Sequence, residues 1–385
     1  MDQILAITIQ NLKSIPARLG TSLVAVVGVA GVVAVLVAVL SMARGFESTL
    51  ESGTSPGNVI VMRSGSSSEL DSGIQGDQAR TIAQAPQLSM VSPEVYVIVD
   101  LEKKSSGTQA NVPMRGVGAD AAAIRAEFRM VEGRMFEAGR REVIAGRGVA
   151  DQYVGLEVGN TLEFGTERWD VVGIFESGGG SAESELWTDA ATLQGAYRRG
   201  NSFSVVYGRL ESPEGFAAFK DELTSNPQLS VRVERESEYF AEQSQALSSF
   251  ISVVGYGIAV LMALGALFGA LNTMYTAVSD RAREIATLRA LGFTPVSIVA
   301  SVMAEAMLLA LAGGVIGAGI AWLLFNGFTV STLNFTSFSQ VVFAFAVTPD
   351  LLVQGIVIAL IIGLVGGLAP AIRAARMPIV SALRE

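Results

Sequence analysis

The sequence predicts an α-helical membrane protein with four transmembrane helices and one α+β domain outside the cytoplasm. Half of its 385 residues are apolar and the mean hydropathy is +0.46, which is typical of a membrane protein. The apolar residues gather in four stretches, and as helices of about 1.5 Å per residue each reaches the roughly 30 Å needed to cross a bilayer. Lys and Arg cluster beside some ends of these stretches and avoid others. The expected spans are residues 21–43, 250–274, 299–325 and 351–372.

The positions of the basic residues predict the orientation, because cytoplasmic loops of membrane proteins are enriched in Lys and Arg. The loop at 326–350 has none, whereas the chain before the first span, the loop at 275–298 and the tail at 373–385 are basic. We therefore expect a multi-pass protein of the plasma (inner) membrane with both termini in the cytoplasm. The residues expected to anchor it at the cytoplasmic lipid surface are Arg18, Arg373 and Arg376.

The segment at 1–20 has an apolar stripe of helical spacing ahead of the first span. It is interpreted as a cytoplasmic elbow helix lying in the membrane interface. A continuous extension of the first membrane helix remains the alternative, although Pro16 favours a break. The first span itself is expected to be an uncleaved anchor, because its apolar run is about twice as long as that of a signal peptide.

Composition excludes several kinds of function. Between residues 45 and 245 the chain has 30 Asp or Glu and 18 Lys or Arg, so the exported region is acidic and offers no electrostatic surface for nucleic acid. The sequence contains no Cys and no His. Disulfides, thiol nucleophiles and Ser-His-Asp triads are therefore excluded, and we expect no metal site and no catalytic residue in this chain.

The exported region at 44–249 alternates strand and helix signals and divides into two parts. Its ends, 44–115 and 204–249, predict a small α+β unit, and its middle, 116–203, predicts a β-rich insertion. Residues 237–249 have a helical pattern that runs directly into the second span. Strands are expected at 58–62, 95–99, 142–145, 161–164, 169–175, 204–210 and 230–234, and helices at 77–85 and 213–226.

The loop after the second span predicts an amphipathic helix ending at Gly292. Val278, Ile285 and Leu288 would share one face, while Arg281 lies on the other with further charged residues. Such a helix suits docking into a groove of a soluble partner, and a helix lying on the membrane surface is an equal alternative from the residues alone. No GxxxxGK[ST] motif occurs in the chain, so ATP hydrolysis would have to come from a partner.

Glu305 lies in or at the cytoplasmic edge of the third span, where a carboxylate is costly unless it is paired or hydrated. It could act in transport or in proton relay. We favour a structural role in which it bonds the neighbouring loop or Asn272.

Two long motifs resemble the MacB and FtsX-like permease family of ABC transporters. The segment NTMYTAVSDRAREIATLRALG at 272–292 resembles the family's coupling-helix pattern, N-T-[ML]-x-x-x-V-x-[ED]-R-x-[RK]-E-I-x-x-L-[RK]-A-[LI]-G. The segment GLAPAIRAARMPIVSALR at 367–384 resembles its closing motif. Weaker similarity covers the rest of the chain, and in this family the exported region is a porter-like unit with a β-rich insertion.

The resemblance implies which residues form each surface. Docking of an ATPase would use the polar side chains of Arg281, Arg283, Glu284 and Arg289 within the segment from Asp280 to Gly292. GxxxG pairs in three spans would mark close helix packing. The full sets are Asp280, Arg281, Arg283, Glu284, Ile285, Leu288, Arg289, Leu291 and Gly292 for ATPase coupling, and Gly265, Gly269, Gly313, Gly317, Gly363 and Gly367 for helix packing.

The function implied is that of a permease that is not itself an enzyme. Two ATPase subunits would bind ATP and Mg²⁺, and their movement would pass through the coupling helices to the exported domain, a process called mechanotransmission. MacB proper carries a fused ATPase domain, whereas here about twenty residues precede the first span, so a separate ATPase chain is expected. A second permease copy or a paralogue completes the dimer, and membrane lipid, a periplasmic adaptor and an outer-membrane channel are further candidate partners.

Alternative functions differ in what the helices move. The leading expectation is efflux or extraction of a substrate from the outer side of the membrane. Others are an FtsX-like regulator of an exported partner, such as a cell-wall hydrolase, and a lipoprotein-release permease. A membrane-anchored enzyme using paired carboxylates is the least favoured, because exported Asp and Glu residues are too numerous to single out a pair.

Overall fold

The computed structural model describes residues 19–125, 127–164, 167–334 and 337–379. Residues 1–18 of the expected elbow helix, including Arg18, lie outside the described residues. The chain forms two compact units, one helical and one built around a β-sheet. The helical unit comprises the described residues up to Arg44, residues 249–328 and those from Phe345 onward, and the sheet unit comprises residues 45–248 and 329–344.

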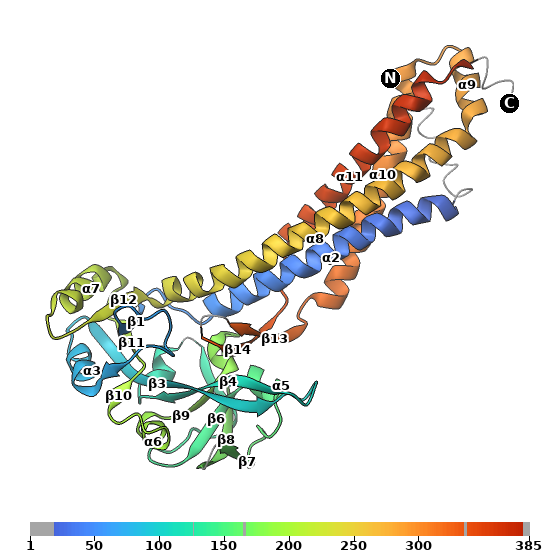
Figure 1. The fold of residues 1–385 in the computed structure, drawn as a ribbon. Coiled ribbons are helices and arrows are strands. Elements are labelled where there is room, and N and C mark those ends of the chain that lie inside the picture. Colours follow the sequence, from blue (N-terminus) through green and yellow to red (C-terminus); the bar gives the residue numbers. More distant parts are fainter. Residues whose placement is uncertain (1–18, 126, 165–166, 335–336, 380–385) are drawn as a thin grey trace. The chain divides into compact units, whose positions relative to one another are not determined.

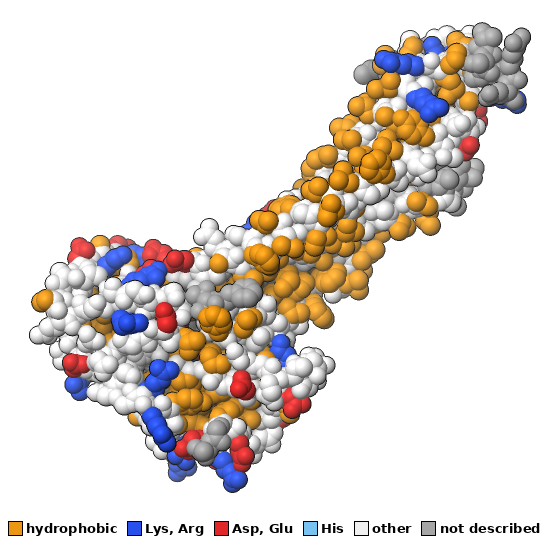
Figure 2. Space-filling view, viewed as in Figure 1, with side chains coloured by type: hydrophobic (Ala, Val, Ile, Leu, Met, Phe, Trp, Pro, Cys, Tyr) orange, Lys and Arg blue, Asp and Glu red, His pale blue; other side chains and the backbone are white. Residues whose placement is uncertain are grey.

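Four helices of the described chain are long and apolar enough to cross a membrane, and each expected span lies within one of them. The two longest of them have 33 and 45 residues, well beyond the roughly 20 that a span requires. Figure 2 shows hydrophobic side chains gathered over the surface of these helices, as expected of lipid-facing residues. The helices are α2 (Leu19–Glu51), α8 (Glu236–Asp280), α10 (Pro295–Phe325) and α11 (Pro349–Arg376), with the short α9 (Ala282–Ala290) between α8 and α10.

The sheet unit is built on one sheet of ten strands in the order β12-β1-β11-β3-β4-β9-β6-β8-β5, with β7 paired to β8. Helices and short 3₁₀ turns cover it, and two small two-stranded sheets complete the unit (Figure 1). The strands are β1 (Asn58–Arg63), β2 (Ile74–Gln75), β3 (Leu88–Glu102), β4 (Gln109–Val117), β5 (Phe128–Gly133), β6 (Glu142–Gly146), β7 (Thr161–Phe164), β8 (Glu167–Ser177), β9 (Leu186–Asp189), β10 (Ser202–Phe203), β11 (Val205–Leu210), β12 (Val231–Arg235), β13 (Thr329–Asn334) and β14 (Ser339–Ala344). The helices are α3 (Gly76–Ala83), α4 (Ala121–Ile124), α5 (Arg147–Gln152), η2 (Ser181–Ser184), α6 (Ala190–Ala196), η3 (Pro213–Gly215) and α7 (Phe216–Ser225).

The two parts that the sequence distinguishes share this one sheet, and the long strand β3 joins them. Its first half, up to Glu94, pairs with β11, and its second half, from Val95, pairs with β4. Strands β12, β1 and β11 therefore lie on one side of β3, and β4 lies on the other with β5 to β9. We call the junction at Glu94 and Val95 the seam of the sheet.

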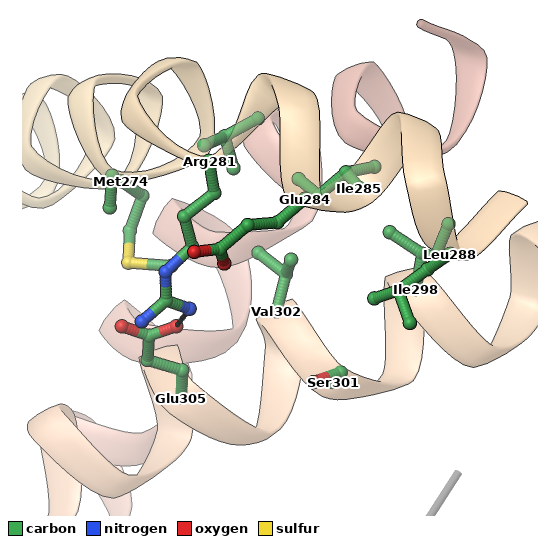
Figure 3. Close-up of a pocket in the computed structure, with 11 residues that line it drawn as sticks. Met274, Arg281, Glu284, Ile285, Leu288, Ile298, Ser301, Val302 and Glu305 are labelled. Atoms are coloured by element: carbon green, nitrogen blue, oxygen red, sulfur yellow. Dashed lines mark hydrogen bonds and ion pairs between the residues drawn. The ribbon is translucent and has the colours of Figure 1, made fainter. Parts of the chain in front are cut away.

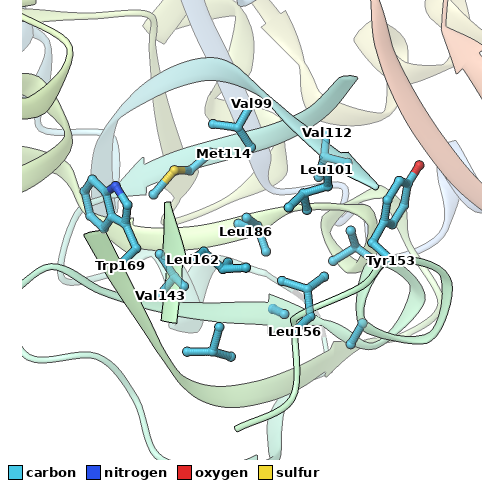
Figure 4. Packing of buried hydrophobic residues seen from close by; sticks show 14 of the residues in the cluster. Val99, Leu101, Val112, Met114, Val143, Tyr153, Leu156, Leu162, Trp169 and Leu186 are labelled. Atoms are coloured by element: carbon cyan, nitrogen blue, oxygen red, sulfur yellow. The ribbon is translucent and has the colours of Figure 1, made fainter. Parts of the chain in front are cut away.

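The core beneath the second half of the sheet is formed by large, fully buried side chains. Trp169 and Tyr153 have no exposed surface and pack with aliphatic residues such as Met114 and Leu186 (Figure 4). Alternating apolar residues on β3 and β4 supply one wall of this core. At about 25 cal/mol per Å² of buried apolar surface, such side chains supply the main stabilisation of a domain without disulfides.

The structure adds elements that the sequence did not predict. Residues 326–350 were expected to be a short exported loop, but they contain the hairpin β13–β14, which belongs to the sheet unit. The hydroxyl of Ser184 accepts a hydrogen bond from the backbone N–H of Val342 at 2.9 Å and fixes the hairpin to that unit. The helix expected at 213–226 starts with one 3₁₀ turn, because Pro213 and its neighbours form η3 before α7 begins.

Candidate functional site

The candidate coupling site lies at the end of α8, where the expected single helix over 272–292 is broken into two. The break falls at Arg281, whose backbone (φ −105°, ψ 12°) leaves the helical region, and α9 follows from Ala282. Gly292 ends the segment with φ of +98°, a backbone conformation that favours glycine. Thr294 then caps α10, which begins with Pro295, a residue well suited to the first turn.

Arg281 and Glu305 form a buried ion pair that connects this break to α10. The guanidinium Nη1 donates to Glu305 Oε2 at 3.1 Å, and both side chains are about 95% buried, at 5% and 6% exposure. Arg281, which was expected on the polar outer face of the helix, therefore points inward. The expectation that Glu305 bonds the neighbouring loop is met by this contact.

A cleft of about 440 Å³, measured with the open solvent at its mouth, lies between α8, α9 and α10. Figure 3 shows the Arg281 guanidinium directed across this cleft to the Glu305 carboxylate, with Val302 nearby. Its walls are mostly apolar, and charged side chains occupy one side. The lining residues are Met274, Ala277, Val278, Arg281, Glu284, Ile285, Leu288, Ile298, Ser301, Val302 and Glu305.

The other predicted coupling residues divide between the surface and the interior. Ile285 is buried and Leu288 is half-buried against α10, as their apolar spacing predicts. Arg289 is half-buried, and its Nη1 donates to the carbonyl of Met377 at 2.8 Å, which ties α9 to the segment after α11. Leu291 is 73% exposed, a high value for a large apolar side chain. The remaining exposed residues of the set are Asp280, Arg283, Glu284 and Gly292.

The glycines expected at helix packing faces fall into two groups. A Cβ on Gly313 or Gly317 would meet the backbone of α2, and one on Gly363 or Gly367 would meet alanines of α10. These four therefore sit where helices of the helical unit approach each other most closely. On α8, a Cβ added to Gly265 or Gly269 would have no heavy atom of the described residues within 4 Å.

The two arginines expected at the lipid surface lie exposed in the last turns of α11. The guanidinium of Arg373 also lies 5.4 Å from the ring centre of Tyr275 on α8, within cation–π distance. Pro370 lies inside α11, and the helix continues past it to Arg376.

Sequence reasoning missed the partner of Glu305, although a signal was present. A carboxylate in an apolar span requires a cation, and Arg281 stands one turn from the buried Val278 and Ile285. Spacings of three and four residues place all of these on one face of a helix. That spacing would have assigned Arg281 to the inner face.

Two family models match this chain over most of its length. Residues 22–226 match the MacB-like periplasmic core domain, and residues 256–379 match the FtsX-like permease C-terminal domain. Among the curated relatives is the macrolide export ATP-binding/permease protein MacB of Vibrio parahaemolyticus, which is 21% identical over 328 residues, covering 80% of this chain and 48% of the relative. Its counterpart from Nitrosomonas europaea is 27% identical over 279 residues, covering 66% of this chain and 40% of the relative.

The chain thus spans about half the length, or less, of these curated relatives. Among solved structures, the periplasmic region of MacB from Actinobacillus actinomycetemcomitans aligns with a TM-score of 0.39 and 12% identity, covering 49% of this chain and 92% of that one. The family models match more than half of the chain, and their ranges include part or all of each of the four long helices and the sheet unit except residues 227–248. The chain therefore belongs to the MacB/FtsX-like permease family of ABC transporters and is a multi-pass inner-membrane protein.

Proposed function

We propose that this chain is the permease subunit of a MacB-like ABC transporter that couples ATP hydrolysis in a separate ATPase chain to movement of the sheet unit. Two ATPase subunits, which bind the ATP and Mg²⁺, pair with two permease chains, identical or paralogous. The termini and α9 face the cytoplasm, and the sheet unit lies on the outer side. On that side the sheet unit acts on a substrate, and the substrate does not cross the membrane through this chain.

The observation that carries this proposal is the form of α9. It is a nine-residue helix with exposed charges of both signs, Arg283 and Glu284, followed by the exposed apolar Leu291. A soluble partner could bind such a surface through charge pairs around one apolar anchor. On its other side α9 is fixed to α10 through Ile285 and to the segment after α11 through Arg289.

The route for the movement is supported by the continuity of two helices. Helix α2 passes without a break from the helical unit into the sheet unit between Arg44 and Gly45. Helix α8 passes without a break in the reverse direction, from the sheet unit into the helical unit, between Ser248 and Ser249. An unbroken helix resists compression and bending along its length, so a displacement of its cytoplasmic end is expected to reach the sheet unit. Such transmission would be the mechanotransmission that the family resemblance implies.

The names of the relatives suggest which class of substrate to test. Both MacB relatives above carry macrolide export in their names. Macrolides are therefore the first substrates to test for this chain. An adaptor protein and an outer-membrane channel are the partners such an export route would require.

The test is to purify the tagged chain from the membranes of the cells that naturally produce it and to place it in nanodiscs. ATP hydrolysis is then measured, and the chains that co-purify are identified. We expect the wild type to retain an ATPase subunit with a P-loop. The double variant Arg283→Glu/Glu284→Arg reverses both exposed charges of α9. The ATP hydrolysis that co-purifies with it should be at least about tenfold lower than with the wild type, since each charge pair with the ATPase then becomes repulsive.

The matched control is Asp350→Lys, which reverses an exposed charge in the first turn of α11. That end of α11 is the exported end in the proposed orientation, so the control should retain the ATPase as the wild type does. Equal retention by all three chains would exclude α9 as the docking surface. Absence of any ATPase from the wild type would overturn the permease assignment.

A further inference from the structure

Six buried ionisable residues gather in the sheet unit at the seam of the sheet and the start of α8. Glu94 lies at the seam, Arg115 stands beside it on β4, and Glu236 is the first residue of α8. All six are at least 93% buried. We call them the charge cluster: Glu69, Glu94, Arg115, Arg125, Glu185 and Glu236.

The two arginines hold three of the four carboxylates. Arg115 binds Glu185 through Nε and Nη2 at 2.7 Å each, and its Nη1 donates to Glu94 at 3.0 Å and to Glu69. Arg125 makes two parallel hydrogen bonds to Glu94, each 2.7 Å long. Such bidentate pairs are strong and resist rearrangement.

Glu236 differs from the other three because the hydrogen bonds that it accepts come from neutral groups. Its Oε2 accepts from the amide Nδ2 of Asn58 on β1 at 2.7 Å and from the backbone N–H of Ser55 at 3.4 Å. Seating of the first turn of α8 against β1 therefore places a carboxylate among neutral donors, in a region already rich in carboxylates.

The charges of the cluster do not balance. Four carboxylates face two guanidiniums, and the half-buried Arg209 adds a third cation whose donors go to neutral oxygens of Asn58 and Ile124. At least one negative charge is left over when every carboxylate is ionised. A buried uncompensated charge is costly, and a carboxyl group avoids that cost by retaining its proton.

We propose that the charge cluster is a proton-linked latch: a proton is bound when the first turn of α8 seats on β1 and is released when that turn leaves. The latch does not depend on the ATPase. It acts on the helix whose continuation is the second membrane span, so in the proposed orientation the acidity on the outer side of the membrane would set how firmly that helix is held.

The direction of the pH dependence follows from burial. Burial raises the pKa of Glu236, with Arg125 acting in the opposite direction, and burial likewise raises the pKa of Glu69 against the effect of Arg115. An acid whose pKa is raised in the seated state stabilises that state fully below its ordinary value near 4.5 and loses this stabilisation as the pH rises through the raised pKa. Acid should therefore close the latch, and neutral to alkaline pH should loosen it.

Other groups facing the cluster keep their charge state over this range. Tyr96, Tyr207 and Tyr239 line it from β3, β11 and α8, and burial raises the pKa of each phenol, so all three stay neutral. The pKa values of the guanidiniums of Arg115 and Arg125 are raised by the surrounding carboxylates, so both stay charged. Glu236 and Glu69, whose pKa values burial raises, are therefore the titrating groups.

The test is hydrogen–deuterium exchange of the full chain in nanodiscs, without ATPase or nucleotide, between pH 5 and pH 8. Protection factors of the segment 236–243, corrected for the intrinsic pH dependence of exchange, report opening of the first turn of α8. One linked proton predicts that protection falls by up to about tenfold per pH unit above the ordinary carboxyl pKa. Glu236→Gln, which mimics the protonated acid, should keep the protection high and remove its dependence on pH.

The matched control is Glu238→Gln, which removes an exposed carboxylate from the same turn and should keep the pH dependence of the wild type. Protection of the core segment at 143–153 shows whether each variant is folded. A wild type whose protection does not change with pH would overturn the latch, and so would a Glu236→Gln variant with the wild-type slope. Either result leaves the permease proposal standing, because no ATPase takes part in the measurement.

Discussion

In the helical unit, Arg281 and Glu305 are two buried charges that pair with each other. Each side chain is nearly inaccessible, and the contact joins two residues that are 24 positions apart. Removal of one member of a buried pair costs more than removal of both, because a charge is left in a site of low polarity. The pair is therefore expected to hold the break between α8 and α9 in place.

Arg281→Gln or Glu305→Gln alone should destabilise the chain by about 3–5 kcal/mol, whereas the double variant should recover much of that loss. The measurement is thermal unfolding in detergent of all four members of the cycle. Arg283→Gln is the control, since this arginine is exposed and an exposed charge contributes about 0–1 kcal/mol. Additive losses in the cycle would show that the two side chains do not act as a pair.

At the scale of helices, glycine decides how closely the spans approach. A Cβ on Gly317 would meet the backbone carbonyl of Ala30 on α2, and one on Gly363 would meet the Cβ of Ala310 on α10. Within a membrane, association of helices depends on such close packing, because lipid removes the hydrophobic drive between them. The small residues of α10 thus set its distance from α2, and those of α11 set its distance from α10.

Gly317→Leu should destabilise the helical unit by about 1–3 kcal/mol, because the new side chain has to displace the backbone of α2. The matched control is Gly319→Leu, two residues further along the same helix, where no described heavy atom lies within 4 Å of a Cβ. Unfolding temperatures in detergent compare the two. Equal losses would mean that helix propensity, rather than packing against α2, governs the effect.

At the scale of the whole molecule, the chain passes between its two units at four points. Two of these lie inside the continuous helices α2 and α8, and the other two flank the hairpin β13–β14. The helices are stiff, and the hairpin is held in the sheet unit, where Asn334 Nδ2 donates to Gln243 Oε1 at 2.9 Å. Movement of the helical unit is therefore expected to reach the sheet unit through more than one element.

Insertion of Gly-Ser-Gly-Ser between Ser248 and Ser249 should weaken the coupling of the two units while leaving ATPase docking intact. A flexible linker transmits no displacement through α8, so addition of ATP and vanadate should change hydrogen exchange in the sheet unit less than in the wild type. The same insertion after Ser106, in an exposed turn between β3 and β4, is the control and should preserve the response. An unchanged response in the first variant would show that α8 is not the main route.

The sequence by itself determined the four spans, the α+β character of the region between the first two, and the family. These properties rest on local patterns: apolar runs of membrane length, period-two and period-3.6 alternation, and two contiguous motifs. The strand signals at 58–62 and 169–175 correspond to β1 and β8, whereas β4, β5 and β9 were not predicted.

Only the tertiary structure decided which distant residues meet. It joined the two parts of the sheet through β3, placed the hairpin β13–β14 in the sheet unit, and gathered the charge cluster. Arg115 and Glu185, for example, lie 70 positions apart, and each alone resembles an ordinary charged residue within a strand or loop. The physical reason is that the favourable energy of a buried charge belongs to the pair and its surroundings, which no local pattern encodes.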